Sequence, residues 1–176
     1  MGYQTWIADK CREYKLDVVE VHGWQTRGSS YFNPNGVVAH HTASRNTGDA
    51  PALNICINGR AGLSGPLANI VLARSGKVYV IAAGRANHAG AGGYRGLSGN
   101  SSVLGIEAEN DGVGEPWSQA QLDAYYKVSA ALLEGINRDA SWVCGHKEWA
   151  PRRKIDPNGI NMDEFRGIVS RIGRGS

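Results

Sequence analysis

Apolar residues recur along this chain with two periods, one typical of helices and one typical of strands. From Tyr3 to Tyr14 they have helical spacing, which predicts an amphipathic helix near the N-terminus. A second helix is predicted to begin at Ser118, which can form a capping box with Gln121. A last helix is predicted from about Asn161, followed by a frayed tail at residues 171–176.

Short apolar runs between these helices predict strands. The predicted strands are Val18–Val21, Val37–His40, Asn69–Ala73, Lys77–Ala82 and Val103–Glu109. The third and fourth flank a tight turn at residues 74–76 and should form a hairpin. The segment Asp49–Asn58 is predicted as a short helix with Asp49 as its cap. This mixture predicts an α/β fold, in which helices flank a central mixed β-sheet.

Composition limits the domain count and the partners. The chain has 176 residues, which favours one compact domain spanning residues 1–176. Its net charge of +3 suits an anionic wall polymer but is too small to indicate nucleic acid. We expect a monomer. The cysteines Cys11, Cys56 and Cys144 are too few and too scattered for a disulfide framework.

The pattern also bears on localisation. No apolar run approaches membrane-spanning length, so we expect no membrane insertion. The first ten residues, MGYQTWIADK, lack the basic and apolar regions of a signal peptide. We therefore expect synthesis in a cytoplasm and action on an external target reached by another route.

Residues that can carry chemistry gather where predicted strands end. The segment GHKEWAPRRKIDP, residues 145–157, contains two prolines and three consecutive basic residues, which predicts an ordered loop. It holds His146, Lys154 and Asp156. The segment VVAHHTAS provides two histidines, and LGIEAEN provides two glutamates.

A zinc hydrolase could be built from these segments. A catalytic zinc takes three protein ligands and leaves a fourth position for water. One histidine of the first pair, His146 and Asp156 would supply such a set. Zinc lowers the pKa of its water and polarises a carbonyl, and amide hydrolysis also needs a base and an oxyanion donor. Glu107 and Lys154 can fill these two roles.

Each residue also has a structural interpretation. His40 and His41 point to opposite faces of a strand, so at most one should face a site and the other should pack or form a local hydrogen bond. Glu107 and Glu109 share a face, so either could be the base, or both could be solvated. The basic residues 152–154 fit a solvated turn equally well.

The motifs together resemble a known family. GHKEWAPRRKIDP is similar to the GH-x-x-x-AP-x-RK-x-DP signature of zinc-dependent N-acetylmuramoyl-L-alanine amidases, the type 2 amidases related to peptidoglycan recognition proteins. HHTAS resembles their first zinc-ligand strand, and GIEAEN resembles their catalytic-glutamate strand. RSGKVY and NHAG resemble the intervening hairpin and substrate loop. The resemblance covers residues 36–157 and implies the mixed α/β fold of that family.

The resemblance also implies a role for each site residue. It makes His40, His146 and Asp156 the ligands of one Zn²⁺ per chain. It makes Glu107 the general base and Lys154 the oxyanion-stabilising residue.

Two other positions bear on the resemblance. His88, in the NHAG loop, is implied to line the substrate groove. Some family members place a catalytic tyrosine before the hairpin turn, but this chain has Ala68 there, which favours Glu107 as the base.

The segments GRANHAGAGGYRG and GHKEWAPRRKIDPNGI are most similar to the amidase domains of mycobacteriophage endolysins. This implies an enzyme made in a host cytoplasm that cuts the amide between N-acetylmuramic acid and L-alanine in the peptidoglycan of a mycobacterial-type wall. Such endolysins are modular, so we expect either a small single-domain lysin or an excised domain.

Two other functions remain open. One is a non-catalytic peptidoglycan-binding module of the same fold. The other is a histidine–metal nuclease, prompted by His40, His41 and the basic residues 152–154.

Overall fold

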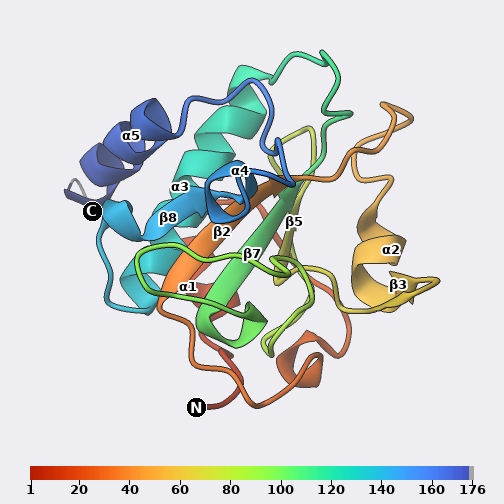
Figure 1. Ribbon diagram of the computed structural model, residues 1–176, viewed down its shortest axis with the longest axis vertical. Coiled ribbons are helices and arrows are strands. Elements are labelled where there is room, and N and C mark those ends of the chain that lie inside the picture. Colours follow the sequence, from red (N-terminus) through yellow and green to blue (C-terminus); the bar gives the residue numbers. More distant parts are fainter. Residues whose placement is uncertain (175–176) are drawn as a thin grey trace.

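A six-stranded mixed sheet forms the centre of the protein, shown in Figure 1 as a computed structural model that describes residues 1–174. Its strands are β1 (Val18–Glu20), β2 (Gly36–His41), β5 (Ile70–Leu72), β6 (Val78–Val80), β7 (Val103–Ala108) and β8 (Val143–Gly145). They lie in the order β1-β6-β5-β7-β2-β8. All neighbours are parallel except β5 and β6, which form the predicted antiparallel hairpin.

Helices cover both faces of this sheet, which confirms the predicted fold class. The α-helices are α1 (Ile7–Glu13), α2 (Leu53–Asn58), α3 (Gln119–Gly135), α4 (His146–Trp149) and α5 (Met162–Arg174). Short 3₁₀ helices span Trp24–Thr26, Asn100–Ser102 and Ala140–Trp142, and β3 (Gly59–Arg60) pairs with β4 (Leu63–Ser64) in a separate small sheet. Within residues 1–174, none of the helices combines the length and apolar character needed to cross a membrane.

The main core lies between the sheet and the helices α1, α3 and α5. The amphipathic patterns that predicted these helices supply its side chains, including Tyr125 and Phe165, whose rings meet edge to face with centroids 5.2 Å apart. On the opposite face a glycine-rich loop, residues 87–96, crosses in front of β2 and β7 (Figure 1). There Trp149 and Cys144 pack with Val38, and α2 covers a third cluster of apolar side chains. Both faces of the central strands are therefore buried from solvent, which explains their continuous apolar sequence.

The register of the parallel strands brings candidate site residues together. His40 is paired with Glu107 across β2 and β7. Ala39 is paired with Gly145 across β2 and β8, so His146 follows beside His40. Three neighbouring strands therefore deliver polar side chains to the same edge of the sheet, at the ends where the apolar run stops.

One predicted helix start is wrong. Helix α2 begins at Leu53, and its N-cap, Ala52, has no side-chain capping bond. The carboxylate of Asp49 instead accepts hydrogen bonds from the backbone N–H and the hydroxyl of Ser75, both at 2.7 Å. Asp49 closes the hairpin turn and is not available to cap the helix.

Three other local predictions differ from the structure in part. Ser118 caps α3 as predicted, but the Gln121 amide donates to the Glu109 carbonyl, so the reciprocal half of the capping box does not form. The segment 145–157 starts with the one-turn helix α4, because its prolines come only after that turn. Helix α5 continues through Arg174, and residues 175–176 lie outside the described part of the chain.

Candidate metal and catalytic site

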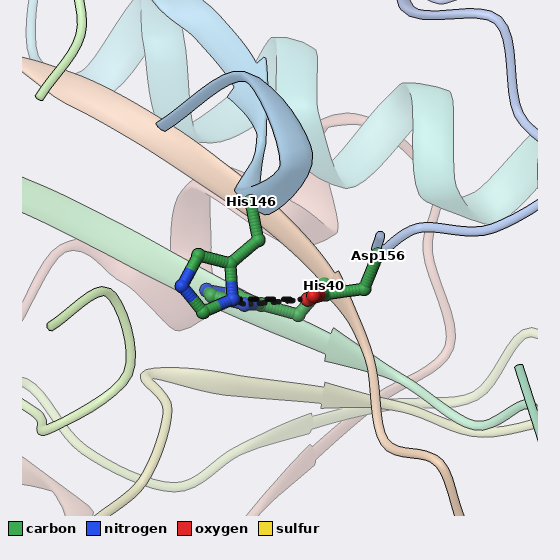
Figure 2. A group of neighbouring side chains, drawn as sticks. All are labelled: His40, His146 and Asp156. Carbon is green, nitrogen blue, oxygen red and sulfur yellow. Dashed lines mark hydrogen bonds and ion pairs between the residues drawn. The ribbon is translucent and has the colours of Figure 1, made fainter. Parts of the chain in front are cut away.

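Three side chains from distant segments converge where β2 and β8 end. His40 is near the end of β2, His146 is the first residue of α4, and Asp156 lies in the loop that follows (Figure 2). The Nδ1 atoms of the two histidines are 3.0 Å apart, and Asp156 Oδ2 is 3.1 Å from each of them. All three residues are buried. The structure thus brings together the three residues expected to hold zinc.

Neighbouring groups determine where the proton of the neutral His40 ring lies. Val103 offers a carbonyl oxygen, which can only accept, to His88 Nε2 at 3.2 Å. His88 therefore carries its proton on Nε2 and presents a bare Nδ1, which lies 2.9 Å from His40 Nε2. For this contact to be a hydrogen bond, His40 must donate from Nε2. Its Nδ1 then bears a free lone pair.

The second ring nitrogen of His146 is held by the main chain. This atom, Nε2, lies 2.8 Å from the carbonyl oxygen of Ala89, which can only accept a proton. The neutral ring therefore also carries its proton on Nε2 and exposes the lone pair of Nδ1. A hydrogen bond from the second ring nitrogen to a carbonyl is a typical support of a metal-ligating histidine.

Three electron-pair donors consequently face one another with no proton between the neutral rings. Such an arrangement is repulsive unless a cation occupies its centre. In a tetrahedral zinc site with Zn–N bonds of about 2.0–2.1 Å, neighbouring ligand atoms are separated by about 3.3 Å. The observed separations of 3.0 and 3.1 Å are slightly shorter. The residues therefore fit zinc in donor type, number and spacing.

The protonation states also suit a cation. Burial lowers the pKa of His40 to about 4, although the neighbouring Asp156 opposes this. Burial alone would raise the pKa of Asp156, but the hydrogen bonds that His146 and His40 donate to it when Nδ1 carries a proton instead of a metal bring it well below its ordinary value. A neutral His40 and an ionised Asp156 are the forms that bind metal.

Glu107 is positioned as a base beside this cluster. Its Oε1 lies 3.9 Å from His40 Nδ1, and its buried Oε2 has no hydrogen-bond partner among residues 1–174. Burial raises the pKa of Glu107 well above 4.5, the charges of Asp156 and Glu109 raise it further, and Lys154 opposes them. A carboxylate with an unused oxygen and a raised pKa is suited to accept a proton.

Glu109, the other glutamate of the motif, has a different environment. Its carboxylate accepts hydrogen bonds from the Thr42 and Ser44 hydroxyls at 3.0 and 2.5 Å and from the Ala52 N–H at 2.7 Å. Arg74 lies 3.7 Å away. Glu109 is fully buried and holds the segment 42–52 against the sheet. Of the two glutamates, the structure leaves only Glu107 available to a substrate.

The cluster opens into a cleft of about 660 Å³. Lys154 and Glu107 line it, and the Lys154 ammonium has no hydrogen bond to the described residues. Ile55 and Ile155 add exposed apolar surface to its walls. The cleft therefore combines a free cation, a free carboxylate and apolar contacts around the metal-competent cluster.

His88 also lines the cleft, as the sequence implied. Both of its ring nitrogens are already engaged, however, one by His40 and one by the Val103 carbonyl. The ring therefore has no free nitrogen with which to hold a substrate.

Sequence reasoning did not find two supporting contacts. His41 Nδ1 accepts a hydrogen bond from the Asn158 N–H at 3.0 Å and so fastens the loop that carries Asp156. The second histidine was expected to pack or to form a local hydrogen bond, but its partner is 117 residues away in the sequence. The Ala89 carbonyl could not have been found, because every residue has one. The three cysteines are buried and free, as expected.

A cleft at the ends of parallel strands, with the donor set of a catalytic metal and a free carboxylate beside it, is the arrangement of a hydrolase. The family comparison agrees with this class. The model of the Amidase_2 family, described as N-acetylmuramoyl-L-alanine amidase, matches residues 30–159, and the chain belongs to this family. It is therefore an enzyme of the amidase class.

Solved structures show the same fold. The endolysin N-acetylmuramoyl-L-alanine amidase LysCS from Clostridium intestinale URNW is 26% identical with a TM-score of 0.62, over 85% of this chain and 93% of that one. An AmpD derivative is 25% identical with a TM-score of 0.67, over 88% and 94%. AmiD from E. coli is 21% identical with a TM-score of 0.65, over 85% and 65%, which shows the fold alone. No curated protein sequence matches the chain.

Proposed function

We propose that this enzyme is a zinc-dependent peptidoglycan hydrolase that cleaves the amide between the lactyl group of N-acetylmuramic acid and the L-alanine of the stem peptide. The observation that carries the metal requirement is the convergence of the lone pairs of His40 and His146 on the carboxylate of Asp156. The substrate class follows from family membership. It is also supported by the fold shared with AmiD, which was solved with anhydro-N-acetylmuramic acid-L-Ala-D-γ-Glu-L-Lys.

Zinc bound by this set would lower the pKa of a water molecule and polarise the scissile carbonyl. Glu107 would take the proton of the attacking water and pass it to the leaving amine of L-alanine. Burial of Glu107 favours this, because a raised pKa makes the carboxylate a better acceptor.

Lys154 would stabilise the negative charge that forms on the carbonyl oxygen. It lines the cleft and its ammonium has no hydrogen-bond partner among residues 1–174, so it can turn toward a substrate oxygen. Replacing Lys154 with methionine keeps most of the side-chain volume and removes the charge. We expect kcat to fall by about 10²–10³-fold with zinc content unchanged, as for other oxyanion donors.

Mass spectrometry of digested peptidoglycan tests the bond that is cut. We expect new N-terminal L-alanine and intact glycan chains. New reducing sugars would indicate a glycosidase, and new ends within the stem peptide would indicate a peptidase. The H40A variant is the matched control, since it removes one ligand of the proposed metal site.

Metal analysis separates the enzyme from a binding module of the same fold. We expect about one zinc per chain, loss of hydrolysis after prolonged chelation and recovery when zinc is restored. Wall binding with no metal uptake and no hydrolysis would instead establish a binding module. Plasmid nicking, which we do not expect, would indicate a nuclease.

We also propose a phage origin and a mycobacterial-type wall as the target, on the basis of the resemblance of the segments around His88 and His146 to mycobacteriophage endolysins. Residues 1–176 would then act as one monomeric catalytic domain, made in the host cytoplasm. Comparing hydrolysis of purified mycobacterial walls with walls of a different stem peptide tests the preference, and light scattering tests the monomer.

A further inference from the structure

We infer that His88 is a positioning residue that orients the metal ligand His40, and that it does not act by contacting the substrate. This inference rests on the proposed zinc site. It is carried by the chain of contacts from His40 Nε2 to His88 Nδ1, at 2.9 Å, and from His88 Nε2 to the Val103 carbonyl, at 3.2 Å.

In this chain of contacts, the donor and the acceptor of each hydrogen bond are fixed. The Val103 carbonyl oxygen can only accept, so the proton of His88 lies on Nε2 and its Nδ1 must accept from His40. His88 therefore selects the form of His40 that directs a free lone pair toward His146 and Asp156. A side chain without an acceptor at this place would leave the buried Nε2–H of His40 unsatisfied or allow the proton to move to Nδ1, where it would block the metal.

The sheet is shaped to accept the His88 ring. A Cβ atom on Gly105, in the middle of β7, would lie 2.6 Å from His88 Cγ and Nδ1. Only a residue without a side chain lets the ring lie against the strand at that point. The position of His88 is thus built into the sheet and is not that of a mobile groove residue.

The loop that carries His88 also orients the second histidine ligand through the Ala89 carbonyl. The Oδ1 atom of Asn100 accepts from the N–H groups of both His88 and Ala89, at 3.1 and 2.8 Å. Arg153 donates to the carbonyls of Ala89 and Ala91 at 3.1 and 2.7 Å. One anchored loop therefore holds both rings, and a disturbance of His88 should be felt at the metal.

The test compares zinc affinity with substrate affinity in two variants at this position. H88L removes the acceptor, whereas H88N retains an oxygen near the place of Nδ1. We expect the zinc dissociation constant, measured by competition with a chromogenic chelator, to rise about 10–100-fold in H88L and less in H88N. At saturating zinc, KM should stay near the wild-type value in both. H22L, at an exposed histidine outside the cleft, is the matched control and should bind zinc as the wild type does.

G105A gives a second test that changes no site residue. The added methyl group should displace the His88 ring and weaken zinc binding in the same direction, and the visible spectrum of the cobalt-substituted protein should change. G105A decides the question alone if H88L does not fold.

Wild-type zinc affinity in folded H88L together with a raised KM would overturn the inference, because it would make His88 a substrate contact. Wild-type zinc affinity in G105A would do the same. A wild-type protein that binds no zinc would instead refute the proposed function, so the two failures are distinguishable.

Discussion

Two carboxylates, two residues apart on the same edge of the sheet, have opposite environments. Glu109 is an acceptor surrounded by donors, with two hydroxyls and a backbone N–H on its oxygens. Glu107 faces other acceptors, Asp156 and the histidines, and one of its oxygens has no partner among the described residues. Both are largely removed from water.

This difference in hydrogen bonding gives Glu109 a role in stability and leaves Glu107 for the chemistry. A buried carboxylate whose oxygens all accept hydrogen bonds contributes to the fold. Its oxygens are then not available to accept a proton from water or substrate. A buried carboxylate without them is a cost to folding, and it persists where a function needs it. The same contrast marks the metal-competent cluster, where three acceptors meet without donors.

The largest expected effect is that of E107Q, which keeps the shape of the side chain and removes its basicity. We expect kcat to fall by about 10²–10⁴-fold, the usual contribution of a general base. Zinc content should not change, because Glu107 is not among the three converging donors. Steady-state kinetics and metal analysis on the same sample measure both. An unchanged kcat would remove Glu107 from the mechanism.

The pH dependence of kcat gives the next effect. The base must be ionised, so kcat should fall roughly tenfold per pH unit below the pKa of Glu107. Burial raises this pKa well above 4.5, whereas a bound zinc ion would lower it, so the acidic limb is compared between the wild type and a variant with the same metal content. The E109Q variant removes the negative charge of Glu109, so the acidic limb of the kcat profile should move to lower pH. A limb that is unchanged in E109Q would show that it reports another group.

For E109Q we expect a loss of stability with little loss of chemistry. The new amide cannot accept on both sides, so either the Ala52 N–H or the two hydroxyls lose a charged partner. The free energy of unfolding should fall by about 1–3 kcal/mol. Denaturant unfolding of metal-free protein measures this, and kcat per folded molecule at neutral pH checks the second half. A large drop in kcat without destabilisation would reverse the assignment of the two glutamates.

The smallest effect is expected for S44A. It removes one of the donors to Glu109 and leaves Thr42 and Ala52 in place. The free energy of unfolding should fall by about 0.5–1.5 kcal/mol, the usual net value of one hydrogen bond. Combining S44A with E109Q in a double-mutant cycle would show whether the two act through the same contact. Strict additivity would mean that they do not.

Local patterns were sufficient to predict five of the six strands of the central sheet, the hairpin and the helices α1, α3 and α5, but not the three-residue strand β8. They failed where a partner is remote in sequence. Asp49 has the right place for a helix cap, but its partner Ser75 is 26 residues away. No local pattern shows which of two interactions a carboxylate will choose.

The candidate site divides in the same way. The family resemblance indicated His40, Glu107, His146, Lys154 and Asp156, and the structure brings them to one cleft. From the residues alone, Glu107 and Glu109 could not be distinguished. The distinction arises because the segment 42–52 folds over one of them and leaves the other open.

The contact between His146 and the Ala89 carbonyl has a consequence for genetics. A side-chain replacement at residue 89 does not remove the carbonyl oxygen, but Ala89 is fully buried in the cluster with Trp149, so a larger side chain would shift the backbone that carries it. Alanine scanning would find His88 and pass over its neighbour. Only changes that move the backbone, such as a deletion or a proline, would expose what residue 89 contributes.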